Sequence, residues 1–129
     1  MTAHRILQIN AVSTGACALG IFAARPIVPS LFGLEGPVLL DTVGVGLAAY
    51  ALVSGLAASR ETVRRRTLIV FTVADALWVI ASGVVLVLFW TELAAIARAL
   101  IIVVALTVEL FAVLQFRAAR FVGRSAEAV

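Results

Sequence analysis

The sequence predicts an all-α fold: a membrane-embedded bundle of four helices that run alternately up and down. Hydrophobic residues make up 64% of the 129 residues and charged residues only 13%, whereas soluble domains contain about 45–50% and about 25%. A chain of this size cannot hide so much apolar surface from water. In addition, four apolar stretches have the length that crosses a bilayer, about 20 residues. We therefore expect most of this chain to lie within a lipid bilayer.

The four predicted helices cover residues 6–24, 37–58, 67–89 and 93–116. Arginine, proline or glutamate bounds each of them, as expected where a helix leaves the hydrocarbon. They form one transmembrane domain over residues 1–129, which ends in a short basic tail, 117–129. The tail is predicted to be disordered in its last few residues.

The first helix is the most polar of the four, and we expect it to pack inside the bundle. Its Ala16-Cys17-Ala18 also has the A-x-A pattern of a signal-peptidase site. Because Gln8 and Asn10 break the apolar region before that pattern, an uncleaved helix is the preferred interpretation. The connection 25–36 contains Leu31, Phe32, Leu34 and Glu35, which indicates a short segment at the membrane interface.

Arginine counting predicts the orientation. Eight of the ten arginines lie on one side of the predicted bundle, namely Arg5, Arg60, Arg64, Arg65, Arg66, Arg117, Arg120 and Arg124. Because basic loops stay in the cytoplasm, both termini and the 59–66 loop are predicted to be cytoplasmic. The net charge of +3 then reflects topology and contact with anionic lipid headgroups. We expect no nucleic-acid partner.

The sequence lacks the residues that several classes of membrane enzyme need. It has one cysteine, Cys17, and one histidine, His4, at the terminus, which excludes a disulfide within the chain and a bis-histidine haem or metal site. It also has no phosphate-binding loop, nucleophile elbow or zinc-protease motif. We therefore predict that the protein is not an enzyme, with no catalytic residues, metal site or cofactor.

Two carboxyl groups lie within the predicted helices at similar depth. Asp75 is nine residues after Arg66 and Glu109 eight residues before Arg117, about 13 and 12 Å from the same end. Ser13 and Thr14 of the first helix reach a similar level. Two neighbouring carboxylates in a low dielectric cannot both stay ionised. The sequence thus indicates a proton or cation site; alternatively, Asp75 only donates a hydrogen bond that fixes helix register.

Asp41 and Arg98 form a second polar pair, near the other end of the predicted bundle. Opposite charges at similar depth in an apolar medium should pair, because either alone is costly. We therefore expect a structural ion pair between them.

Several short patches resemble a set of small bacterial four-helix integral membrane proteins for which no activity is established. They are Leu7-Gln8-Ile9-Asn10-Ala11, Leu31-Phe32-Gly33-Leu34, Ala74-Asp75-Ala76-Leu77-Trp78 and Leu114-Gln115. The resemblance implies a multi-pass protein of the bacterial inner membrane. The helix count is also similar to that of small multidrug-resistance exporters, but the first helix lacks their essential glutamate.

Two functions are therefore expected from the sequence. The first is a non-enzymatic integral membrane protein that packs with, or regulates, other membrane components. Its partners would be the lipid bilayer and either a second copy of the chain or another membrane protein. The alternative is a proton- or cation-coupled transporter of a small solute that uses Asp75 and Glu109. A closed core around Asp75 favours the first function, and a water-filled cavity reaching it favours the second.

Overall fold

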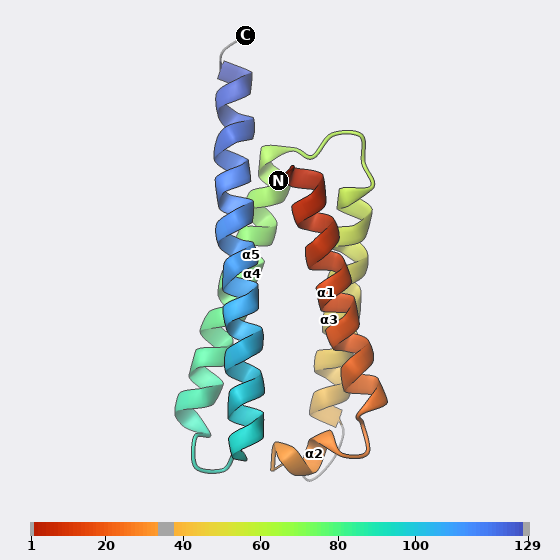
Figure 1. Cartoon of the computed structure of the whole chain (residues 1–129), viewed down its shortest axis with the longest axis vertical. Coiled ribbons are helices and arrows are strands. Elements are labelled where there is room, and N and C mark those ends of the chain that lie inside the picture. Colours follow the sequence, from red (N-terminus) through yellow and green to blue (C-terminus); the bar gives the residue numbers. More distant parts are fainter. Residues whose placement is uncertain (1, 34–37, 128–129) are drawn as a thin grey trace.

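The computed structural model describes residues 2–33 and 38–127, which are entirely helical apart from turns and short connections (Figure 1). The described helices are α1 (Ala3–Ala23), α2 (Val28–Leu31), α3 (Val38–Ala58), α4 (Arg65–Leu88) and α5 (Ala95–Glu127). Four of them, α1, α3, α4 and α5, are long and apolar enough to cross a membrane. The predicted all-α class is confirmed, and the four spans indicate a multi-pass membrane protein.

The helix bounds agree with the prediction to within a few residues, except at the end of α5. α1 begins three residues earlier than predicted, at Ala3, where the hydroxyl of Thr2 accepts the backbone N–H of Arg5 (3.4 Å). α5 continues to Glu127 instead of ending at Phe116, because the residues that follow include several arginines and alanines, which favour helix in water as well as in lipid. The predicted first residue of the second helix, residue 37, lies outside the described residues, as do residues 34 and 35 and the last two of the tail.

The long helices form two hairpins: α1 packs against α3, and α4 against α5. Small residues allow α1 and α3 to approach closely. A Cβ added to Gly55 would lie 3.8 Å from the Cβ of Ala11, and one added to Gly44 would lie 2.9 Å from the ring of Phe22. Contacts between α1 and α5 join the two hairpins.

The start of α1, the end of α5 and the α3–α4 connection lie at the same end of the bundle (Figure 1), which we call the arginine-rich end. There the imidazole Nε2 of His4 lies 2.9 Å from the backbone oxygen of Arg60, so α1 is tied to the α3–α4 connection. A buried apolar cluster fills the bundle at this end; it consists of Leu7, Ala58, Val63, Leu68, Phe71 and Ala119. Because these residues come from both hairpins, the cluster holds them together.

The opposite end is closed by α2 and the turn between α4 and α5 (Figure 1). A short helix, α2, with Pro29 in its first turn stands where the sequence predicts an interfacial segment. Gly33 follows it with a φ of 65°, a conformation that glycine adopts without strain. A Cβ at Gly33 would lie 3.2 Å from the backbone oxygen of Glu92. The α2 connection therefore reaches the α4–α5 turn.

Candidate functional site

One carboxyl group, that of Asp75 in α4, is bound by side chains from the three other long helices. Its Oδ2 accepts a hydrogen bond from Nδ2 of Asn10 in α1 (3.2 Å) and from Nε2 of Gln115 in α5 (3.0 Å). Its Oδ1 accepts the hydroxyl of Tyr50 in α3 (2.5 Å). We call Asn10, Tyr50, Asp75 and Gln115 the Asp75 cluster. Every long helix contributes one member.

Further hydrogen bonds orient the members of the cluster. Nδ2 of Asn10 also lies 3.4 Å from the Tyr50 hydroxyl, and Oδ1 of Asn10 accepts the hydroxyl of Thr14, one turn further along α1 (3.1 Å). Thr14 therefore fixes which way the Asn10 amide faces, so that its NH₂ group points at Asp75. Of the two hydroxyl residues predicted near Asp75, Thr14 belongs to this network and the half-buried Ser13 does not.

The helical period brings the cluster together. In α1, Leu7, Asn10 and Ala18 are buried, and in α4, Leu68, Phe71 and Asp75. These spacings of three, four and eight residues place each set on one face of its helix. In α5 the buried residues are Ala97, Phe111, Ala112, Gln115 and Ala119. The polar members thus occupy positions in rows that are otherwise apolar.

The chain encloses the site. Asn10 is 2% exposed, Asp75 4% and Gln115 0%. The ring of Tyr50 packs edge-on against that of Phe71, with centroids 5.4 Å apart and planes at 88°, which links the cluster to the apolar cluster at the arginine-rich end. Within the described residues no arginine contacts Asp75, so its three partners are all neutral donors.

Two buried polar atoms beside this site lack a partner. Oε1 of Gln115 and Nε1 of Trp78, one turn beyond Asp75 in α4, make no hydrogen bond within the described residues. Buried polar atoms usually have partners. The Gln115 carbonyl is therefore an acceptor available to a proton donor that enters the cluster.

Glu109 does not join Asp75, and the predicted pairing of the two carboxyls is wrong. The side chain of Glu109 is exposed on the outside of the bundle. Gln115, which does reach Asp75, is six residues further along α5, about 9 Å by helical rise and about 120° away around the helix. Counting residues from the flanking arginines, Arg66 and Arg117, placed Glu109 level with Asp75. However, helical side chains lean toward the N-terminus of their helix. Because α4 and α5 are antiparallel, their side chains lean in opposite directions, so residues at the same depth along the two axes do not face each other.

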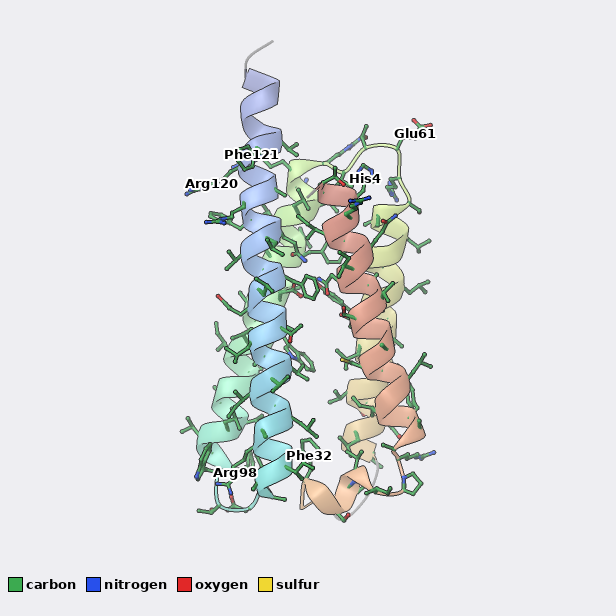
Figure 2. The ribbon with its side chains drawn as sticks, in the orientation of Figure 1. His4, Phe32, Glu61, Arg98, Arg120 and Phe121 are labelled. Atoms are coloured by element: carbon green, nitrogen blue, oxygen red, sulfur yellow. The ribbon has the colours of Figure 1, made fainter. Side chains whose placement is uncertain are left out.

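The predicted pair of Asp41 with Arg98 is also wrong. Oδ2 of Asp41 instead binds Nη2 of Arg25 at 2.7 Å, because the α1–α3 hairpin brings the end of α1 beside the start of α3. The guanidinium of Arg98 lies over the ring of Trp90, 4.6 Å from its centroid. Figure 2 shows Arg98 beside the α4–α5 turn, at the far end of the bundle from His4. Each arginine thus has a partner from its own hairpin.

The sequence contained a weak signal for the members that the prediction left out. Asn10 and Gln115 are polar residues within apolar stretches, and Gln115 is on the helical row 97, 101, 104, 108, 111, 115 and 119. The prediction instead paired Asp75 with Glu109, which lies on a neighbouring row of α5, because a charge is more costly in lipid than an amide. Which of the two rows faces the interior depends on how α5 packs against α4. The sequence of α5 alone does not show this.

Compared with protein families, curated proteins and solved structures, the chain shows no match. The resemblance to small bacterial membrane proteins stays a prediction. Among the described residues, no group of three or more His, Cys, Asp and Glu side chains could hold a metal ion. What the arrangement can do chemically follows from Asp75: it can link four helices, and it can accept a proton.

Proposed function

We propose that this chain is a non-enzymatic, multi-pass protein of the bacterial inner membrane that packs with other membrane-embedded proteins. In this role the Asp75 cluster holds the two hairpins in one arrangement, and the outer helix faces receive the partner. The distribution of arginines supports an orientation with both termini in the cytoplasm. Reporters fused to the C-terminus and inserted in the 59–66 loop should both be cytoplasmic, and a periplasmic signal from either would contradict this orientation.

The closed polar core supports a structural role for Asp75. Three donors from three helices satisfy its carboxyl, and the chain buries all but 4% of the residue. Interhelical hydrogen bonds of this kind stabilise membrane bundles by about 0.6 kcal/mol each. A buried side chain with three partners links the helices and fixes their relative positions. An outer surface that packs with another protein needs helices held in fixed positions.

Glu109 is the observation that carries the proposal of a partner. It is an exposed carboxyl eight residues from Arg117 and eleven from Arg98, hence about 12 and 16 Å from these flanking charges. An isolated acidic side chain near the middle of a bilayer costs about 2.5–3.5 kcal/mol on insertion scales. Such residues almost always face protein or a water-filled cavity. A partner helix over this face removes the cost.

A photocrosslinking amino acid in place of Leu110, beside Glu109, tests the proposal in native membranes. We expect adducts of discrete protein mass from this position. The same substitution at Leu52 in α3 and at Leu77 in α4, which are 64% and 61% exposed, provides matched control faces. If all three positions yield only lipid adducts, the chain does not pack with other proteins and the proposal fails.

Proton binding at Asp75 is a second candidate function, and one observation favours it. A protonated Asp75 would donate its O–H toward Tyr50, whose own hydroxyl would then need another acceptor. The unpartnered Oε1 of Gln115 is such an acceptor within the cluster. Here Asp75 would act alone, because Glu109 is on the outside.

Proton flux into liposomes containing the purified full chain separates the two functions. A pH-sensitive dye inside the liposomes reports the flux after a pH jump. Under the packing function, the wild-type protein and Asp75→Asn behave alike. A faster wild-type flux that Asp75→Asn abolishes would favour proton transport, because an amide side chain, unlike a carboxyl, does not take up and release protons near neutral pH.

A further inference from the structure

The two hairpins pack closely against each other in only one half of the bundle. In α4 the buried residues end at Asp75, and none of the described residues 76–88 beyond it is buried. In α5 the same holds for the described residues 98–110. A helix inside a bundle normally buries one stripe along its length. Figure 1 shows α1 leaning away from α5 toward the end that α2 closes. The hairpins therefore diverge beyond Asp75.

The helix rows on either side of this divergence lose their burial beyond the Asp75 cluster. Asn10 in α1, Asp75 in α4 and Gln115 in α5 are buried. Further along the same rows toward α2, at helical steps of three, four or seven residues, the side chains are only half-buried. They are Thr14 and Ile21 in α1, Trp78 and Ser82 in α4, and Val104 and Val108 in α5. We call the space between these six residues the interhairpin cleft.

The walls of the cleft are mainly apolar. The two hydroxyl groups among its six residues already have acceptors, since Ser82 donates to the backbone oxygen of Trp78 (2.9 Å) and Thr14 to Oδ1 of Asn10 (3.1 Å). Because α2 and the α4–α5 turn close the far end (Figure 1), the cleft opens sideways between the hairpins, toward lipid. It therefore admits molecules that dissolve in the bilayer.

Two buried polar atoms without a hydrogen-bond partner lie where the cleft meets the Asp75 cluster. They are Nε1 of Trp78, a donor, and Oε1 of Gln115, an acceptor. Side chains lean toward the N-terminus of their own helix, so Trp78 leans back toward the level of Asp75, and Gln115 leans toward the level of Trp78. The two side chains thus converge. A single group that both accepts and donates a hydrogen bond satisfies both atoms.

We propose that the interhairpin cleft binds a neutral, lipid-soluble alcohol, with its hydroxyl at Trp78 and Gln115 and its apolar chain along the cleft. The hydroxyl oxygen accepts the indole N–H of Trp78, and the hydroxyl hydrogen is donated to Oε1 of Gln115. The chain covers the half-buried side chains of Val104 and Val108. This site is independent of the proposed packing function, which uses the outer helix faces.

The donor and the acceptor together select the class of ligand. A carboxylate only accepts hydrogen bonds, so it leaves Gln115 unsatisfied, and no arginine among the described residues contacts Asp75 to offset the repulsion between two anions. An ammonium only donates, so it leaves Trp78 unsatisfied. A hydroxyl does both without a charge. Water has the same hydrogen-bonding groups, but it does not cover the apolar walls.

Trp78 itself provides the reporter for the test. The chain has two tryptophans, so Trp90→Phe leaves Trp78 as the only one. The probe is dodecanol that carries bromine on the carbon next to its CH₂OH group, because bromine quenches tryptophan fluorescence only on close approach. With the full chain in phosphatidylcholine liposomes, we expect quenching that saturates. Bromododecane, which lacks the hydroxyl, should quench without saturation, as a molecule that only dissolves in the bilayer does.

A second single-tryptophan protein controls for the location of the probe. Trp78→Phe leaves Trp90, which is half exposed beside the α4–α5 turn and outside the cleft. Both probes should quench Trp90 without saturation. Saturation at Trp90 as well as at Trp78 would mean that the alcohol binds elsewhere on the protein, and it would overturn the site.

Variants in the Trp90→Phe protein then test the two parts of the site. Gln115→Leu removes the acceptor and should weaken alcohol binding about 2- to 13-fold, the range of one neutral hydrogen bond. Because Gln115 also donates to Asp75, a second variant leaves the cluster intact: Val104→Phe narrows the cleft and should abolish saturation. Val103→Phe is the matched control on the outer face, where Val103 is 60% exposed, and it should bind as before.

The remaining outcomes each decide one part of the proposal. Unsaturable quenching of Trp78 by the alcohol would mean that the cleft holds only lipid chains or water, and it would overturn the site. Equal affinity for the alcohol and bromododecane would refute the role of the hydroxyl, as would unchanged binding in Gln115→Leu. Equal effects of Val104→Phe and Val103→Phe would refute the cleft as the location. Photocrosslinks from Leu110 report on the packing function alone, so either proposal can fail without the other.

Discussion

Replacing Asp75 should reveal how strongly one carboxyl links the four helices. Asp75→Ala removes the acceptor of three interhelical hydrogen bonds, from Asn10, Tyr50 and Gln115. At about 0.6 kcal/mol for an average bond in a membrane protein, and about 1.7 at most, the free energy of unfolding should fall by about 2 kcal/mol. The loss can reach about 5 kcal/mol, because the Tyr50 hydroxyl and the Gln115 amide lose the acceptor that Asp75 supplies.

Asp75→Asn should cost much less. The amide oxygen can occupy the place of Oδ2 and keep the donors of Asn10 and Gln115, while its NH₂ group meets the oxygen of Tyr50. About one bond is lost, so we expect a decrease of less than about 1 kcal/mol. Equilibrium unfolding in mixed detergent micelles measures both variants. Thr72→Ala is a matched control on the same helix, because its hydroxyl bonds only to its own backbone, at Leu68 (2.8 Å).

A double-mutant cycle completes the test. Tyr50→Phe should cost about 0.6 kcal/mol in the wild-type protein and nothing in Asp75→Ala, since the acceptor is already gone. The reasoning is refuted if Asp75→Ala loses no more stability than Thr72→Ala. A gain of stability in Asp75→Ala would refute it as well, since burial of the carboxyl would then cost more than its hydrogen bonds return.

Two further predictions concern the contacts within the first hairpin. Gly44→Leu should destabilise the α1–α3 contact by about 1–3 kcal/mol, because the new side chain meets the ring of Phe22; an unchanged melting curve would mean that the helices do not approach closely here. Asp41→Ala and Arg25→Ala should be non-additive by about 0.2–1 kcal/mol, as for other exposed ion pairs. Arg98→Ala should be additive with Asp41→Ala, and coupling between those two instead would contradict the observed pairing.

The sequence predicted which segments are helical more reliably than how they face one another. Apolar length and flanking charge decide whether a segment spans a bilayer, and both can be read along one helix. The extension of α5 past residue 116 was missed because those residues leave the apolar stretch while keeping helix-forming side chains. Secondary structure there follows local preference, which the search for an apolar span does not consider.

The candidate site was predicted only in part, for a geometric reason. Asp75 was singled out as a polar residue within an apolar helix, and it does lie in the interior, since a charge in such a helix has to face protein. Its partners depend on the rotation and stagger of the neighbouring helix, and a shift of one helical row exchanges Gln115 for Glu109. The rows of α5 that contain Gln115 and Glu109 both recur at steps of three and four residues, and both carry a polar residue. Only contact with α4 distinguishes them.

The division of the Asp75 cluster between the hairpins has a consequence for biogenesis. Asn10 and Tyr50 belong to the first hairpin to be synthesised, and Asp75 and Gln115 to the second. Each hairpin can therefore enter the bilayer with its polar side chains already bonded to each other, in the way that membrane helices insert before they associate. When the two hairpins associate, the two separate hydrogen-bonded pairs become parts of one network. A hairpin made alone would be able to insert, but it would lack the hydrogen bonds that join Asn10 and Tyr50 of the first hairpin to Asp75 of the second.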